Sequence, residues 1–86
     1  MAALIAVICA FLIKLTPIEW GLLLLTIFMV LVAEVINTAI EKTVDLVTED
    51  FHPLAKMAKN IAAGAVLLTA INAILMAVVI FGKHIL

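Results

Sequence analysis

A run of acidic and amide side chains lies at the end of a long apolar stretch of this sequence. The residues Glu34, Asn37, Glu41 and Asp45, which we call the polar stripe, follow one another at intervals of three or four. On an α-helix these side chains fall within roughly 80° of one another, with Thr38 at the margin of the same face. A charge in or near hydrocarbon costs roughly 2.5 to 3.5 kcal/mol, so such groups usually face a site or a partner. The spacing therefore predicts a functional face.

The chemistry that suits the polar stripe is phosphoryl transfer. Carboxylates on one face can hold Mg²⁺, which prefers one or two carboxylates together with phosphate oxygens. A lysine on an opposing helix, such as Lys56 or Lys59, neutralises phosphate charge. Burial raises the pKa of a carboxylate such as Glu34 toward that of a useful base for a lipid hydroxyl. Metal, phosphate clamp and base are the parts that phosphoryl transfer needs. The sequence has no glycine-rich phosphate loop, so a nucleotide site here differs from the P-loop type.

Three helices must position these groups, and we expect them at about 2–14, 17–47 and 53–84. Thr16 suits an N-cap, and Pro17 suits the first helical position. A short polar turn at 48–52 ends before Pro53, which marks the third helix. The first apolar run spans only about 18 Å as a helix, against roughly 30 Å of hydrocarbon. We expect an all-α membrane protein with three crossings, forming one domain over residues 1–86.

The third helix begins with polar residues and then becomes apolar. Its small residues at 62–65 allow close helix approach in lipid, and Thr69 and Asn72 are candidates for hydrogen bonds to a neighbouring helix. The lysines number three on the side of the polar turn and two on the other side, which favours a cytoplasmic turn.

Composition supports the membrane class. The chain has 86 residues, of which 69% are hydrophobic, and its net charge is −1. That hydrophobic fraction is typical of membrane proteins, and there is no basic footprint for nucleic acid. The single cysteine, Cys9, supports neither a disulfide framework nor a zinc site.

Two other functions fit the same residues. The polar helix end could serve only to cap a small oligomer, with Glu34 paired to Lys59. Alternatively, Glu34 could form a proton- or ion-translocating site. The spacing of the polar residues does not decide between these two functions and phosphoryl transfer.

The stretch EVINTAIEKTVD, at 34–45, resembles the signature of the small prokaryotic diacylglycerol kinase family, which includes the undecaprenol kinases of Gram-positive bacteria. The resemblance continues through EDFHP at 49–53 and AKNIAAGAV at 58–66, and it covers nearly all of the chain. The sequence of the turn region, DLVTEDFHPLAK, more closely resembles the undecaprenol kinase branch.

This resemblance implies a homotrimeric lipid kinase of the bacterial inner membrane, with its site on the cytoplasmic side. It would use ATP and Mg²⁺ to phosphorylate undecaprenol or diacylglycerol. By the resemblance, Glu34 corresponds to the general base, and Glu41 holds metal and contacts nucleotide. Asn37 and Asp45 line the same site.

The resemblance also assigns residues in the turn and the third helix. It implies that Asp50, Phe51 and His52 sit against the nucleotide. Lys59 contacts the phosphates together with Asn60.

The chain departs from the family pattern at two places. Family members usually carry an amphipathic surface helix before the first crossing, whereas this sequence begins inside that crossing, as expected if residues upstream of Met1 were removed. Asn60 stands where the family normally has Asp, and an amide lacks the negative charge. Because both departures fall on the catalytic machinery, impaired activity is expected. The alternative hypothesis is a catalytically inactive helical membrane assembly of the same fold.

Overall fold

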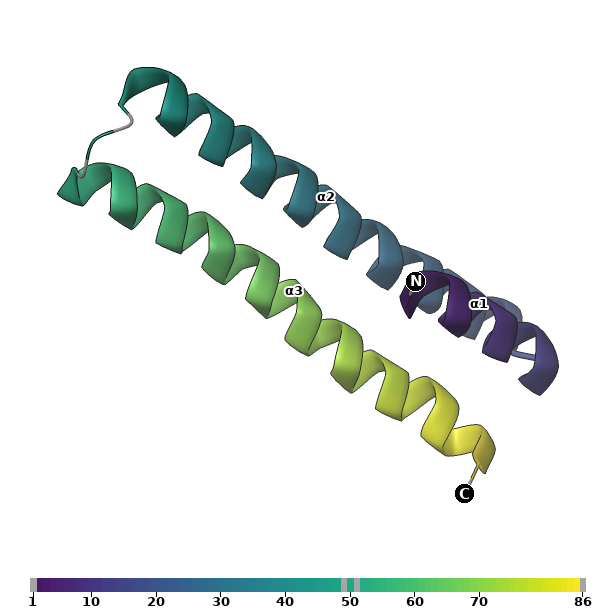
Figure 1. The fold of residues 1–86 in the computed structure, drawn as a ribbon. Helices are drawn as coiled ribbons and strands as arrows, with labels where there is room; N and C mark the ends of the chain where they lie inside the picture. Colours follow the sequence, from purple (N-terminus) through teal and green to yellow (C-terminus); the bar gives the residue numbers. More distant parts are fainter. Residues whose placement is uncertain (1, 49, 51, 86) are drawn as a thin grey trace.

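The computed structural model describes residues 2–48, 50 and 52–85, and this part of the chain is all-α (Figure 1). The helices are α1 (Ala2–Ile13), α2 (Pro17–Val47) and α3 (Pro53–Ile85). Helices α2 and α3 run antiparallel as a long hairpin, and α1 folds back beside the first part of α2. The molecule is a rod of 51 × 19 × 18 Å. The all-α class is confirmed.

The first helix ends one residue earlier than expected. Lys14 adopts a φ of 61°, in the left-handed region, and its backbone N–H donates to the Ala10 carbonyl at 3.1 Å. A left-handed residue cannot continue a right-handed helix, so the chain reverses here toward α2. With 12 residues, α1 is about 18 Å long and shorter than the hydrocarbon core of a bilayer.

The start of α2 is fixed by the predicted N-cap. The Thr16 hydroxyl accepts a hydrogen bond from the Glu19 backbone N–H at 3.2 Å, and the Glu19 Oε1 accepts one from the Thr16 backbone N–H at 3.1 Å. Pro17 occupies the first turn, where its missing N–H has no cost. This reciprocal capping box satisfies two backbone donors that the helix itself leaves free.

The α2–α3 turn is closed by local hydrogen bonds. The Thr48 N–H donates to the Val44 carbonyl at 2.9 Å, and the Thr48 hydroxyl accepts from the Asp50 N–H at 3.2 Å. On the other side of the turn, the His52 Nδ1 accepts from the Leu54 N–H at 3.2 Å. His52 therefore caps α3 in the way that a serine or aspartate caps most helices.

The buried core lies at the end of the hairpin away from this turn. One buried cluster consists of Ala10, Leu15, Leu23 and Ile80, each at most 8% exposed. Next to the cluster, the rings of Phe11 and Trp20 meet with their centroids 4.9 Å apart, which fastens α1 to α2. Most other large apolar side chains are exposed on the outside of the rod.

Both long helices are long and apolar enough to cross a membrane. At 31 and 33 residues, α2 and α3 are about 46 and 50 Å long, so they extend beyond roughly 30 Å of hydrocarbon. Thr69, which we expected to bond a neighbouring helix, instead donates to the Val66 carbonyl of α3 at 2.7 Å. Its hydroxyl is satisfied within its own helix because that acceptor lies one turn away.

Candidate functional site

Five of the predicted site residues lie together where α2 and α3 meet the turn. They line a groove of about 410 Å³, which we call the turn-end groove. The five are Asp45, Asp50, His52, Lys59 and Asn60. The groove also contains Lys56, so cationic, anionic and amide groups share one opening.

An ion pair in the turn-end groove joins Lys59 to Asp45. The Lys59 Nζ lies 2.6 Å from the Asp45 Oδ1, and the two side chains are 40% and 49% exposed. A half-exposed ion pair contributes only about 0 to 1 kcal/mol. An incoming anion can therefore replace the Asp45 carboxylate at little cost. The pairing of Lys59 with Glu34, considered above for a purely structural helix end, does not occur; Asp45 lies close to the turn, directly across from Lys59, whereas Glu34 lies about 16 Å further along α2.

His52 reaches the turn-end groove with a defined tautomer. Because its Nδ1 accepts the Leu54 N–H, the proton of the neutral ring is assigned to Nε2. The ring thus offers one N–H donor besides its capping contact.

Asn37 and Glu41 form a second unit of the polar stripe. The Asn37 Nδ2 donates to the Glu41 Oε1 at 3.1 Å, one helical turn apart. The Asn37 Oδ1 is buried and has no hydrogen-bond partner among the residues that the structure describes. Such an atom costs about 1 to 3 kcal/mol when it is left unpaired, so it marks a position where a donor is missing.

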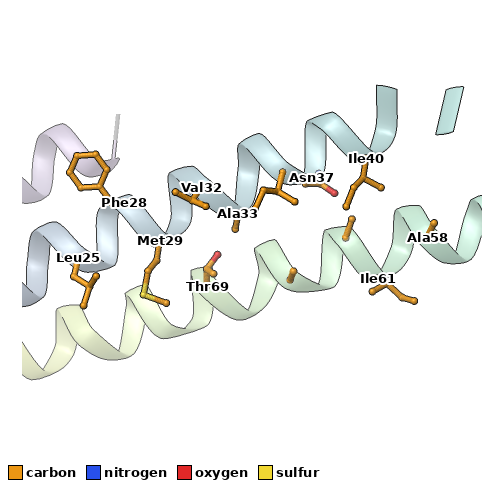
Figure 2. A pocket seen from close by; sticks show the side chains of 13 residues that line it. Leu25, Phe28, Met29, Val32, Ala33, Asn37, Ile40, Ala58, Ile61 and Thr69 are labelled. Carbon is orange, nitrogen blue, oxygen red and sulfur yellow. The ribbon is translucent and has the colours of Figure 1, made fainter. Parts of the chain in front are cut away.

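Asn37 faces an apolar groove between α2 and α3, which we call the inter-helix groove (Figure 2). It has a volume of about 770 Å³. Met29 points from α2 toward α3, and Thr69 points from α3 toward α2. Its lining is almost entirely apolar, and the principal side chains are Leu25, Phe28, Val32, Ile36, Ile40 and Ile61.

Glu34 stands apart from both grooves. Its side chain is exposed and lines neither of them, and within the described residues it has no hydrogen-bond or ion-pair partner. Along α2 it lies about 10 Å from Glu41 and about 16 Å from Asp45. The single chain therefore gathers five of the eight predicted nucleotide-binding residues in the turn-end groove and leaves the predicted base on the surface of the hairpin. Phe51 lies outside the described residues.

Among the described residues, no group of three or more His, Cys, Asp or Glu side chains could hold a metal ion. Glu41 keeps one carboxylate oxygen free of Asn37, and Asp45 follows it by one turn on the same face. This donor set fits Mg²⁺, because Mg²⁺ takes one or two carboxylates and completes its shell with phosphate oxygens and water.

One polar contact was missed by the sequence analysis. The His84 Nε2 lies 3.0 Å from the Glu19 Oε1 and 2.9 Å from the Glu19 Oε2, joining the last turn of α3 to the first turn of α2. The two residues are 65 positions apart, and no pattern of spacing indicates a contact at that separation.

The fold and the site together define a helical membrane protein with a carboxylate- and lysine-lined site at one end of a hairpin. The family described as "Prokaryotic diacylglycerol kinase" matches residues 1–81. The chain belongs to this family.

Three relatives illustrate the range of similarity. An undecaprenol kinase from Bacillus subtilis is 48% identical over 80 residues, covering 93% of this chain and 65% of the relative. A diacylglycerol kinase from Helicobacter pylori is 54% identical over 50 residues, covering 58% of this chain and 39% of the relative. A diacylglycerol kinase from Escherichia coli is 31% identical over 84 residues, covering 98% and 69%. The chain thus spans less than two thirds of the length of the first two relatives.

Proposed function

We propose that this protein is a membrane lipid kinase that transfers the γ-phosphate of ATP to a lipid alcohol, either undecaprenol or diacylglycerol. The observation that carries the proposal is the turn-end groove, where Lys59, Asp45, Asp50, His52 and Asn60 share one opening in a chain of this family. The names of the relatives supply the two candidate lipids.

The nucleotide would bind at the turn-end groove. Lys59 would exchange the half-exposed Asp45 carboxylate for phosphate oxygens, a stronger partner because they carry more negative charge. The Nε2–H of His52 would donate to the nucleotide, and the Asn60 amide would bond beside Lys59.

Glu41 would hold Mg²⁺ through the carboxylate oxygen that Asn37 leaves free. When bound, the ion supplies positive charge that neutralises the phosphate oxygens. The hydrogen bond from the Asn37 amide fixes the orientation of the Glu41 carboxylate.

The lipid alcohol would approach Glu34 from the bilayer. Glu34 is exposed on the outside of an apolar helix, so a lipid hydroxyl reaches it by lateral diffusion without crossing the protein. Glu34 would accept the hydroxyl proton while the oxygen bonds to the γ-phosphorus. The bond from that phosphorus to the bridging oxygen breaks, and ADP leaves.

The position of Glu34 supports an oligomer. A carboxylate exposed on a membrane helix costs roughly 2.5 to 3.5 kcal/mol, and a polar group of a neighbouring chain beside Glu34 would lower that cost while leaving the carboxylate open to the lipid hydroxyl. We propose a homotrimer, as the family resemblance implies. We also propose that the turn-end groove faces the cytoplasm, which the lysine count of three on the side of the turn against two on the other supports.

The experiment is lipid-dependent ATP turnover in detergent micelles with Mg²⁺, run in parallel with undecaprenol and diacylglycerol. We expect turnover with one or both lipids and a loss of about 10²- to 10⁴-fold in Glu34→Gln, which removes the base. Lys42→Gln is the matched control, because Lys42 is exposed on the same helix and lies off the polar stripe.

If neither the parent chain nor Asn60→Asp shows lipid-dependent ATP turnover, the kinase proposal is contradicted and the inactive assembly is favoured. A transporter predicts a different pattern, in which Glu34 matters but Glu41, Asp45 and Lys59 do not. The kinase proposal predicts that substitution of any of these four residues lowers ATP turnover.

A further inference from the structure

No step of the proposed reaction uses the inter-helix groove, although Asn37 joins it to the polar stripe. Eleven of its thirteen lining side chains are apolar. Of the two polar ones, the Thr69 hydroxyl donates to the Val66 carbonyl of its own helix, and Asn37 lies near the end of the groove toward the turn (Figure 2). The interior of the groove therefore suits a hydrocarbon ligand and not a charged one.

The dimensions of the groove fit one hydrocarbon chain. Between Leu25 and Ile40 the groove runs about 22 Å along α2, so its volume of about 770 Å³ corresponds to a cross-section of roughly 35 Å². Nonbonded carbon atoms approach to about 3.5 to 4.0 Å, so one methyl-branched chain roughly 4 to 5 Å wide fills this section, and two chains side by side exceed it. An α-helix is about 10 to 12 Å across with its side chains, so it can lie over the groove but cannot enter it.

Short side chains leave this space between the two helices. Ala33 on α2 lines the groove together with Ala58, Ala62 and Ala65 on α3. Ala65 is exposed, so its methyl group borders the open part of the groove. An empty groove would deprive the lining side chains of contacts with neighbouring atoms. In a bilayer, a hydrocarbon chain supplies those contacts.

The direction of the groove matches that of a lipid alcohol in a membrane. Leu25 lies toward the distal end of the hairpin, the end away from the turn, and Asn37 lies toward the turn. Along α2, Glu34 precedes Asn37 by about 4.5 Å, and Asn37 donates to Glu41. A hydroxyl at this end is therefore close to the proposed base, whereas the phosphate of a phospholipid would meet two carboxylates that repel it.

We propose that the inter-helix groove binds the hydrocarbon chain of the lipid alcohol and, because it holds one chain, selects undecaprenol over diacylglycerol. At about 22 Å the groove is longer than one leaflet, which is roughly 15 Å of hydrocarbon, and a polyprenyl chain is long enough to fill it. Phosphorylation of the hydroxyl rests on the proposed function. The position of the hydrocarbon chain is tested without turnover.

Photolabelling of the full protein in lipid nanodiscs tests the position of the hydrocarbon chain. The probe is undecaprenol that carries a diazirine on its chain, and mass spectrometry identifies the labelled residues. We expect labels on lining residues such as Phe28 and Ile61, and not on Val35 and Leu68, which are each 69% exposed outside the groove. Unlabelled undecaprenol should abolish this labelling, whereas an equal amount of diacylglycerol should leave most of it.

Ala65→Phe is the variant that fills the groove, because the added ring extends from an exposed lining position. Ala63→Phe is the matched control, because Ala63 is exposed on the same helix and lines neither named groove. We expect Ala65→Phe to lower the labelling about tenfold and to raise KM for undecaprenol about tenfold, because the ring occupies the space of the hydrocarbon chain. KM for ATP should not change, and the control should behave as the parent does.

Four results would overturn the inference. Labels on the outward positions in a protein that turns over ATP would remove the groove assignment and leave the kinase proposal standing. Equal competition by diacylglycerol would remove the selection. Normal labelling of a folded Ala65→Phe variant would show that the hydrocarbon chain lies elsewhere. An unlabelled groove, with Ala65→Phe changing the mass of the oligomer, would show that a second copy covers it. Labelling of the groove without ATP turnover would support the groove assignment and contradict the kinase proposal.

Discussion

At the scale of single residues, the members of the polar stripe differ in what they already bond. Asp45 forms an ion pair with Lys59, and Asn37 donates to Glu41, whereas the Glu34 side chain has no partner among the described residues. Side chains that bond one another are positioned before any ligand arrives, which lowers the entropy lost on binding. In the turn-end groove, Lys59 and Asp45 are already positioned by their ion pair, so substitutions there should act directly on ligand binding.

Lys59→Gln should weaken ATP binding. A hydrogen bond to a charged group is worth about 1.5 to 3 kcal/mol, so kcat/KM for ATP should fall by roughly 10- to 100-fold. The measurement is steady-state ATP turnover at saturating lipid, with Lys42→Gln beside it. An unchanged kcat/KM for ATP would show that Lys59 does not contact the phosphates.

Asn60→Asp should raise Mg²⁺-dependent turnover by about tenfold, because it restores a carboxylate beside Lys59. Asn60 is exposed, so the free energy of unfolding should change by no more than about 0.5 kcal/mol. Turnover and thermal unfolding are measured on the same preparation. A lower turnover at unchanged stability would mean that the added charge repels the nucleotide.

At the scale of elements, each long helix begins with a side-chain cap. Thr16 and Glu19 cap α2 reciprocally, and His52 caps α3 through its Nδ1. These caps define where the two long helices start.

Thr16→Ala should destabilise the protein by about 1 kcal/mol, because the Glu19 N–H loses its acceptor. Thermal unfolding in detergent measures this change. Thr43→Ala is the control, because its hydroxyl donates only to the Ala39 carbonyl of its own helix. Equal losses in the two variants would show that the cap adds nothing beyond an ordinary threonine.

At the scale of the whole molecule, the hairpin is packed at one end and open at the other. The buried apolar cluster and the Glu19–His84 contact share the distal end, and both grooves lie toward the turn or along the helices. The buried residues that stabilise the fold and the residues of the turn-end groove therefore lie at opposite ends of the rod. Core substitutions should affect unfolding more than they affect ligand binding.

Ile80→Ala should cost about 2 to 5 kcal/mol, because Ile80 is 2% exposed and its removal leaves a cavity. Ile74→Ala, on the same helix but 65% exposed, removes the same atoms and should cost far less. Denaturant unfolding in micelles compares the two variants. Similar losses would mean that the distal cluster is not the stabilising core.

The sequence by itself determined the helices, the membrane class and the face that carries the polar stripe. Those features depend on local signals, namely apolar run length, the Thr16 and Pro17 start, and the 3.6-residue period of Glu34, Asn37, Glu41 and Asp45. The family resemblance also came from contiguous residues, and the match over residues 1–81 confirms it.

Only the tertiary structure decided which polar groups meet. Lys59 bonds Asp45 and not Glu34, and Glu19 bonds His84 across 65 residues. Thr69 bonds its own helix, although its spacing suited a contact with a neighbour. These outcomes depend on how far the antiparallel helices slide past one another and on where α1 reverses at Lys14. The sum of many weak packing contacts sets that register, and no single stretch of sequence encodes it.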